Sequence, residues 1–345
     1  MIVKVLHVTE AFGGGVTSAI NTYVDHSNQF EHYLFASIRD GDVTGEENTG
    51  SFKKFKLVPR NLKSVYSFYE FIRSVQPDVI HIHSTYAGVL VRLLPFISRE
   101  KIIYTPHAYA FLRDDAKWKL KVYYFIEWLL SFRTHIIAGC GRDERNIANQ
   151  FKKAEFTSEL INVCGALPVL NKAGVNQPPI VVMIGRVCEQ KGYRFFAEVA
   201  AKVGSDAKFL WIGGGGSEGV SVLQEAGVEV TGWISRKEVL KYLVNSDIYF
   251  HSAAWDGFPI SVLEAANYEL PIILREIGPF SAEGLDVVNS PSDAAIKIIN
   301  FISNDLATVN ECDRNSRSIR EYHSSSNLSL ALDELYKKIF YKEVR

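Results

Sequence analysis

The stretch Ser252–Pro271, SAAWDGFPISVLEAANYELP, carries most of the information on what this chain is. Asp256 lies in a loop with glycine and proline, and Glu264 follows eight positions later, about two turns into an expected helix. A loop that leads into a helix aims unpaired backbone N–H groups at a phosphate-sized ligand. The Glu264 carboxylate offers two acceptor oxygens, which suit a pair of sugar hydroxyls. The stretch therefore suggests a nucleotide-sugar site.

Two other interpretations of Asp256 and Glu264 stay open. They could be solvated acids on a loop and on a helix surface. Gly257-Phe258-Pro259 between them is costly within a helix or strand, however, which indicates a specific backbone shape. Pro259 suits a first helical turn, because its missing N–H loses no bond there. The two carboxylates could also serve a glycosidase, which needs them roughly 5–9 Å apart, a distance that the spacing cannot fix.

Composition limits the class of protein. The length of 345 residues predicts two domains, since single cores stop growing below that size. The chain is 47% apolar and 22% charged, as soluble globular proteins are, and its net charge of −1 argues against nucleic acid as a partner. The four cysteines show no zinc spacing and no C-x-x-C pair, which is typical of inert, reduced thiols. Without a leader or an apolar run of about 18–20 residues, we expect a cytoplasmic protein.

Strand-like and helix-like segments alternate along the whole chain. The expected strands are residues 3–8, 32–37, 79–83, 101–105, 135–138, 180–184, 208–212, 248–251 and 271–274, and the main expected helices are 16–26, 65–75, 118–132, 193–203 and 328–340. This pattern predicts an α/β fold of parallel sheets covered on both faces. The irregular, proline-containing segment 166–179 divides it.

We therefore expect two Rossmann-like, doubly wound domains that face a central cleft. The first, on the acceptor side, would cover residues 1–167, and the second, which binds the nucleotide sugar, residues 168–325. A C-terminal helix over residues 326–345 would pack back on the first domain. Ligands bind such sheets at the carboxyl ends of the strands, which places the expected site there.

Two cations follow the first strand of the second domain, in Gly185-Arg186 and Gln190-Lys191-Gly192. An arginine fork and a lysine point charge suit a diphosphate, and they would offset the charge that develops as this group leaves. The alternative is two solvated surface cations. Their position after a strand, beside a glycine, favours the functional interpretation.

Gly13–Gly15 follows the first strand, where glycines let a backbone approach a ligand closely. The segment is not a full dinucleotide fingerprint, because Ser18 stands where G-x-G-x-x-G has its third glycine. A simple tight turn is one alternative. A nicotinamide enzyme, with Asp40 as the ribose-binding acid, is another.

Three histidines lie near strand ends. His81 and His83 alternate on one strand and share a face, and His107 comes just past the next strand. This position favours His107 as the residue that touches a ligand. Buried, hydrogen-bonded side chains are the favoured interpretation of His81 and His83, because no third metal ligand can be placed from the sequence.

The segment Lys117–Arg133, KWKLKVYYFIEWLLSFR, has a basic start, aromatic residues and an apolar middle. It could be a helix on a membrane surface or a core helix of an α/β domain. In the core, Glu127 would need a partner.

Together these residues resemble the GT-B glycosyltransferases, and specifically the large retaining family called GT4. That family carries a Gly-Arg…Lys-Gly loop, a glycine-rich strand end and a segment of the form EGFP…LEA. This chain shows Gly185-Arg186…Lys191-Gly192, Ile212-Gly213-Gly214-Gly215 and Asp256-Gly257-Phe258-Pro259…Leu263-Glu264-Ala265. The resemblance covers the second domain and reaches the first through Gly13–Gly15 and His107.

The resemblance implies that the second domain holds the nucleotide sugar. Arg186 and Lys191 would hold the diphosphate, and Glu264 the ribose hydroxyls. The transferred sugar and its phosphate would meet Asp256 and the loop backbone. The residues implied to bind the donor are Gly14, Gly15, Gly185, Arg186, Lys191, Gly257, Phe258, Pro259 and Glu264, and those implied to act in catalysis are Asp256, His107, Arg186 and Lys191.

The resemblance also implies retention of the anomeric configuration, with no metal or other cofactor. The departing phosphate would accept the proton of the acceptor. Two residues depart from the family pattern: Asp256 replaces the usual Glu, and Cys164-Gly165 stands where Asn-Gly is common. The shorter Asp256 side chain puts the sugar contact in question.

The expected protein is a cytoplasmic retaining glycosyltransferase. It would move a sugar from a nucleotide-diphosphate donor to a glycan or lipid-linked glycan, as in bacterial-type polysaccharide or glycoconjugate synthesis. The helix over Lys117–Arg133 would place it on the inner face of the plasma membrane. A sugar-nucleotide epimerase of the same shape and a non-catalytic sugar-nucleotide binder are the alternatives.

Overall fold

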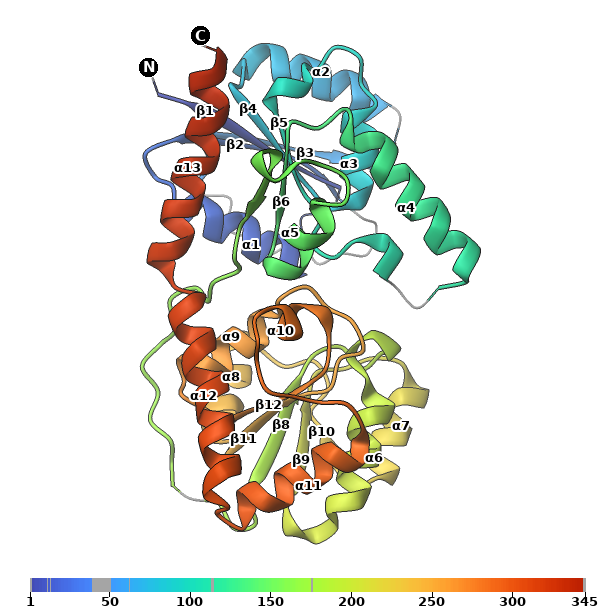
Figure 1. Cartoon of the computed structure of the whole chain (residues 1–345), viewed down its shortest axis with the longest axis vertical. Coiled ribbons are helices and arrows are strands. Elements are labelled where there is room, and N and C mark those ends of the chain that lie inside the picture. Colours follow the sequence, from blue (N-terminus) through green and yellow to red (C-terminus); the bar gives the residue numbers. More distant parts are fainter. Residues whose placement is uncertain are drawn as a thin grey trace. The chain divides into compact units, whose positions relative to one another are not determined.

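The computed structural model describes residues 2–10, 12, 14–38, 51–61, 63–112, 115–174 and 176–343. The chain forms two compact units, of which the first contains Met1–Val163 and Ser325–Arg345 and the second Cys164–Ser324. Each unit is a parallel sheet with helices on both faces, which confirms the expected fold class (Figure 1). Gly13 and Asp40 lie outside the described residues. Among the described helices, none combines the length and the apolar content needed to cross a bilayer.

The sheet of the first unit has the strand order β3-β2-β1-β4-β5-β6-β7, and the paired strands are parallel. The strands are β1 (Lys4–Thr9), β2 (Glu31–Ile38), β3 (Lys54–Pro59), β4 (Val79–His83), β5 (Ile102–Thr105), β6 (Ile136–Gly139) and β7 (Thr157–Glu159). The helices are α1 (Gly14–Asp25), α2 (Lys63–Val75), α3 (Thr85–Arg92), α4 (Lys117–Ser131), α5 (Arg142–Ala148) and α13 (Ser325–Glu343).

Side-chain alternation along the strands sorts this first unit into two layers. Leu6 and Val8 of β1 point to the face where α2 and α3 pack, and both belong to one apolar cluster. His7 lies between them and therefore points to the opposite face. That face is covered by α1 and by α13, which contacts β4 and β7. The last helix of the chain thus belongs to the first unit (Figure 1).

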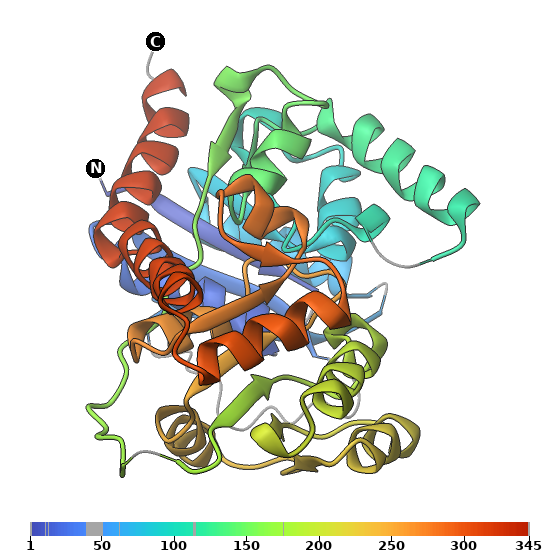
Figure 2. The ribbon, with the colours of Figure 1, turned by 60° about the horizontal axis from the view of Figure 1, so that its bottom comes forward.

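The sheet of the second unit has the order β10-β9-β8-β11-β12-β13, again with parallel pairs. The strands are β8 (Ile180–Ile184), β9 (Lys208–Ile212), β10 (Val228–Val230), β11 (Ile248–His251), β12 (Ile272–Arg275) and β13 (Val287–Val288). The helices are α6 (Tyr193–Val203), α7 (Ser217–Glu225), α8 (Arg236–Val244), α9 (Ile260–Asn267), α10 (Gly278–Ala282), α11 (Pro291–Ile302) and α12 (Leu306–Tyr322). Helix α6 packs with α7 and α11, and α9 packs with α12 (Figure 2).

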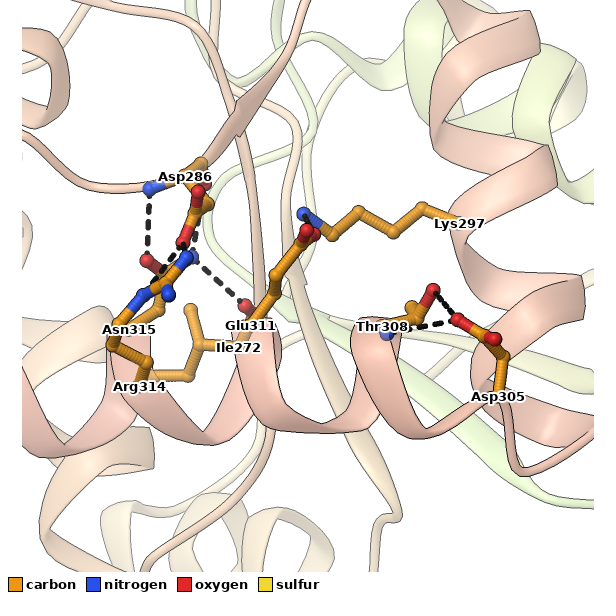
Figure 3. Close-up of polar contacts among 8 residues, drawn as sticks. All are labelled: Ile272, Asp286, Lys297, Asp305, Thr308, Glu311, Arg314 and Asn315. Atoms are coloured by element: carbon orange, nitrogen blue, oxygen red, sulfur yellow. Dashed lines mark hydrogen bonds and ion pairs between the residues drawn. The ribbon is translucent and has the colours of Figure 1, made fainter.

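Polar contacts fix the long helix α12 to the edge of this second sheet (Figure 3). The buried Asn315 amide accepts from the backbone N–H of Asp286 at 2.9 Å and donates to its carbonyl at 2.9 Å. Arg314 pairs with the Asp286 carboxylate at 2.5 Å, and Asp305 caps the helix start through Thr308. A helix with so polar a sequence is therefore held by hydrogen bonds as well as by its apolar face.

Helix α4 is fixed to the first unit by a buried ion pair. Arg92 of α3 donates to Glu127 at 2.8 Å, and both side chains are buried. The Tyr104 hydroxyl donates to the other oxygen of Glu127 at 2.8 Å, and the Arg92 guanidinium lies 3.9 Å from the centre of the Tyr104 ring. These contacts supply the partner that Glu127 was expected to need.

Removing one member of this pair should destabilise the first unit strongly. For Glu127→Ala we expect a loss of about 3–5 kcal/mol in the free energy of unfolding, because Arg92 remains buried without its counter-charge. The triple variant Arg92→Met, Glu127→Leu, Tyr104→Phe should recover most of that loss. Urea unfolding measures both, with the exposed pair member Glu100→Ala as control. An effect of Glu127→Ala as small as that of Glu100→Ala would contradict this account.

Candidate active site

The candidate donor site lies at the carboxyl ends of β8, β9 and β11 in the second unit. Gly185 follows β8 directly, and its N–H donates to the Ile212 carbonyl of β9 at 3.0 Å. Gly213, with φ of 139°, passes so close that an added Cβ would lie 2.2 Å from the Gly185 carbonyl oxygen. The Trp211 indole N–H donates to that same oxygen at 2.8 Å. The glycines at this strand end are therefore explained by the contact between two loops.

The loop after β8 is also tied to the loop after β11. Ala254 N donates to Gln190 O at 2.9 Å, and Ser252 Oγ donates to Lys191 O at 2.9 Å. An added Cβ on Gly192, which has φ of 70°, would lie 2.1 Å from Ser252 O. Only glycine fits at this crossing point. Two segments that are about 60 residues apart in sequence are thereby held in contact.

Lys191 and Asp256 meet across these two loops. The lysine Nζ donates to Asp256 Oδ2, and both side chains are largely shielded from solvent. An added Cβ on Gly185 would lie 3.2 Å from Lys191 Cγ, so the lysine stem passes over the glycine. The strand-end cation and the loop acid thus form one charged pair at the carboxyl edge of the sheet.

Glu264 has a partner that the sequence did not reveal. Its carboxylate is 3% exposed and accepts from the guanidinium of Arg236 at the start of α8. Burial raises the pKa of Glu264, and the arginine opposes that rise. The paired carboxylate can still accept hydrogen bonds from ligand hydroxyls. Helix α9 begins only at Ile260, so Glu264 lies about one turn into it and not two, because the Asp256–Pro259 segment stays outside the helix.

Tyr249 and His251 of β11 are further side chains of this site that the sequence did not point out. The Tyr249 hydroxyl donates to Ser261 Oγ at 2.8 Å and lies 3.3 Å from His251 Nδ1. Burial raises the pKa of Tyr249, and the Glu264 and Asp256 carboxylates raise it further. Both acids therefore act on one buried hydroxyl.

His251 is buried, and its Nε2 has no hydrogen-bond partner among the described residues. The nearest acid is Asp256, whose Oδ2 is 3.8 Å away. Burial and then Lys191 lower the pKa of His251 well below its usual value. A neutral imidazole therefore faces the Lys191–Asp256 pair with one unused nitrogen.

The remaining expected donor residues of the second unit differ in their surroundings. Phe258 is buried against Phe280 and His323, at ring-centre distances of 5.5 Å and 3.8 Å, so only its backbone is available to a ligand. Pro259 is the N-cap residue of α9, and Gly257 precedes this pair. Arg186 is exposed to solvent and is not brought into the Lys191–Asp256 contact.

In the first unit, Gly14 and Gly15 form the start of α1, just after β1. His107 follows β5 and is partly buried, with φ of 51°, and Ala108 follows with φ of 76°. Glu144 holds this uncommon backbone by accepting from Ala108 N at 2.5 Å and from Cys140 N at 2.9 Å. Burial lowers the pKa of His107 to about 4.

The first unit also has a cavity of about 130 Å³ at the carboxyl ends of β1, β2 and β3. Apolar and polar residues line it; the apolar ones are called its floor and the polar ones its rim, which includes Glu10 and Arg60, paired at 3.1 Å. Such a lining suits one face of a sugar ring and its hydroxyls. The rim residues are Thr9, Glu10, Ser37, Arg60, Asn61 and Ser64, and the floor residues include Val8, Phe35, Phe68 and Val91.

The comparisons with known proteins agree with this architecture. The family models described as "Glycosyl transferases group 1" and "Glycosyltransferase Family 4" match residues 178–304 and 12–156. An uncharacterised 41.2 kDa protein in the cps region of Klebsiella pneumoniae is 26% identical, over 98% of this chain and 99% of its own length.

Two characterised proteins are more distant. The Escherichia coli UDP-Gal:alpha-D-GlcNAc-diphosphoundecaprenol alpha-1,3-galactosyltransferase is 23% identical over 63% of this chain and 62% of its own. The crystal structure of Anabaena Alr3699/HepE in complex with UDP and glucose has a TM-score of 0.75 at 13% identity and covers 97% of this chain and 100% of that one. The chain therefore has the GT-B fold and belongs to the group 1 glycosyltransferases, family GT4.

Proposed function

We propose that the protein is a retaining transferase that moves a sugar from a nucleoside-diphosphate sugar to a glycan or lipid-linked glycan in polysaccharide or glycoconjugate synthesis. The observation that carries the proposal is the Lys191–Asp256 pair, held between two strand-end loops, together with the buried Glu264, whose carboxylate acts with that of Asp256 on the Tyr249 hydroxyl. It would work in the cytoplasm, on the inner face of the plasma membrane.

The ion pair suggests how the donor is received. Without a ligand, Asp256 neutralises Lys191. A diphosphate carries more charge than one carboxylate, so it would attract the Lys191 ammonium, and Asp256 would be released toward the sugar. The side chain of Arg186 is exposed to solvent, and it would move toward the diphosphate and bind it.

Glu264 would bind the ribose. Two neighbouring hydroxyls can donate to its two oxygens, and Arg236 favours the ionised form of this buried carboxylate. Gly14, Gly15 and His107 would approach the donor from the first unit. In the chemistry typical of the family, the leaving phosphate accepts the proton of the acceptor hydroxyl, with charge stabilisation from Lys191 and Arg186.

Donor binding is tested by thermal shift with UDP, GDP, ADP and CMP compounds, which also identifies the base. Glu264→Ala and Lys191→Ala should each weaken the best nucleotide about 10- to 100-fold, the cost of losing hydrogen bonds to a charged group. Asp256→Asn should bind the bare nucleotide at least as tightly as the natural protein, because Lys191 is no longer neutralised. Arg194→Ala, which removes an exposed cation paired with Glu189 and Glu218, is the control. Unchanged affinity in both alanine variants would refute the donor site.

Acceptor binding is expected at the cavity of the first unit. The polar rim would bind sugar hydroxyls and the apolar floor one face of the ring. The Escherichia coli relative acts on a diphosphoundecaprenol-linked sugar by its name, which supports a lipid-linked acceptor here.

The transfer reaction separates the proposal from its rivals. Nucleotide release that requires an acceptor is expected, together with a product of retained configuration by NMR. Asn61→Ala, at the cavity rim, should raise the acceptor KM about tenfold and leave the donor KM unchanged. Interconversion of the donor without acceptor would identify an epimerase. Donor binding without release across a panel of lipid-linked and free glycans would identify a binder.

Helix α4 presents an apolar surface that fits a bilayer. Its side chains on one stripe are strongly exposed, and two lysines near its start, Lys117 and Lys121, are exposed as well. Since Glu127 and Leu130 on the other side are buried, the stripe cannot turn inward. Aromatic residues beside lysines suit the interface of an anionic membrane. The stripe, called the α4 surface, consists of Trp118, Val122, Phe125, Trp128, Leu129 and Phe132.

The membrane contact is tested by sedimentation with vesicles. The protein should bind phosphatidylglycerol vesicles more tightly than phosphatidylcholine vesicles, and the double variant Phe125→Ser, Trp128→Ser should lose most of that binding. Tyr66→Ser removes an aromatic residue that is 67% exposed on α2 and should change nothing. If the double variant binds vesicles as the natural protein does, the α4 surface is not a membrane site. The same holds if gel filtration shows that the natural protein is a dimer and that the double variant differs from it only in being a monomer.

A further inference from the structure

Five histidines lie close together in the first unit, on the face of the sheet that α1 and α13 cover. Four are buried: His7 of β1, His32 of β2, and His81 and His83 of β4. His107 after β5 continues the row. His7 and His81 are direct cross-strand partners, which explains why residues 74 positions apart in the chain share one place. Tyr23 of α1 stacks on His81 with ring centres 6.0 Å apart.

Three of these histidines have the geometry of a metal site. One ring nitrogen each of His7, His81 and His83 lies within 4.8 Å of the others. His7 Nδ1 and His83 Nε2 are 3.0 Å apart. Zinc bonds to imidazole of about 2.0–2.1 Å set two nitrogens of a tetrahedral site about 3.3–3.4 Å apart. The pair needs to open by only a few tenths of an ångström, which a small ring rotation supplies.

His7 and His83 each also have a partner for the other ring nitrogen. His7 Nε2 lies 3.1 Å from His32 Nδ1, and His83 Nδ1 lies 3.0 Å from His107 Nε2. Both nitrogens of His81 are hydrogen-bonded, Nε2 to Thr105 Oγ1 at 2.8 Å and Nδ1 to the Tyr336 hydroxyl at 3.0 Å, so a metal would replace one of these contacts and the other would orient the ring. Metal-binding histidines are oriented in this way, by a hydrogen bond from the nitrogen that does not bind the metal.

The proton positions leave a lone pair of His7 facing the cluster. Ser27 Oγ–H donates to Tyr23 O at 2.5 Å, so it cannot also donate to His32. His32 Nε2, which is 3.0 Å from the Ser27 carbonyl, must therefore carry a proton and donate it. A neutral His32 then accepts at Nδ1 from His7 Nε2–H. His7 Nδ1, on the side of His83, is left as a lone pair.

The proton on His83 must move for a metal ion to bind. In the metal-free protein His83 donates its Nε2 proton to His7 Nδ1. A metal requires that proton on His83 Nδ1 instead. His107 Nε2 can accept it once the His107 proton is on Nδ1, toward Cys140 Sγ at 3.2 Å.

We propose that His7, His81 and His83 form a buried binding site for one transition-metal cation, with Zn²⁺ as the ion that best matches three imidazoles. Imidazole nitrogens favour Zn²⁺ over Mg²⁺ and Ca²⁺, which prefer oxygen ligands. A hydroxide in the fourth position would complete the tetrahedron and reduce the buried charge. The site supports the fold by joining β1 to β4, and it takes no part in sugar transfer.

The test uses the untagged full chain, refolded from denaturant either with Zn²⁺ or with EDTA and then desalted. Elemental analysis should find about one zinc per chain after the first treatment, and the Tm should be several degrees higher than after the second. His7→Gln and His83→Gln should lose both the zinc and the shift. His26→Gln, which changes a histidine just after α1 that bonds only to Thr22 O among the described contacts, should keep them. Mg²⁺ should have no effect.

A second measurement does not depend on variants that fold. Co²⁺ substituted into the natural protein should give the intense visible bands of a tetrahedral site, and Zn²⁺ should displace it. Substoichiometric zinc with no change in Tm, or zinc retained by both cluster variants, would overturn the proposal. Neither result would bear on donor binding, which is measured separately with nucleotides.

Discussion

The close crossing of the loops after β8 and β11 is the constraint on which the candidate donor site depends. Gly192 and Ser252 O leave no room for a side chain between them, and backbone hydrogen bonds hold the crossing closed. At this crossing, Lys191 and Asp256 meet as an ion pair. In the proposed donor site, a cation and an acid are thus held together before a ligand binds, which lowers the ordering cost of binding.

The bounds of strands and helices could be predicted from the sequence where a segment is apolar enough for both of its faces to be buried. The bounds of β4, β8, β9, β11 and α6 agree with the expected ones. Strand β3 was missed because it lies at the sheet edge, where half of its residues are exposed, and because its sequence alternates lysines with apolar residues. Helix α12 was missed because its sequence is polar and Asn315 and Asp305 hold it through hydrogen bonds. Edge position and side-chain capping are properties of the assembled fold, not of the local pattern.

The sequence pointed to candidate site residues but not to the side chains that they contact. Strand ends pointed to Lys191, Asp256 and His107, because parallel sheets place such positions at one edge. The contact of Arg236 with Glu264 could not be predicted, because nothing in the sequence links the start of α8 to a residue 28 positions later. The neighbourhood of His7 and His81 was not predictable for a similar reason, because His7 meets His81 only through strand register. The local pattern of one sequence does not contain the contacts between strands and helices that lie far apart along the chain.

The position of α13 has a consequence for the order in which the protein is made. The second unit is one continuous stretch, so it can fold as soon as it has left the ribosome. The first unit consists of two stretches, one before and one after the second unit, and the later stretch supplies Leu332 and Tyr336, which are fully buried. Until that later stretch is made, the histidine-bearing face of the first sheet has α1 but lacks α13, so the first unit can be completed only after the second unit has been synthesised.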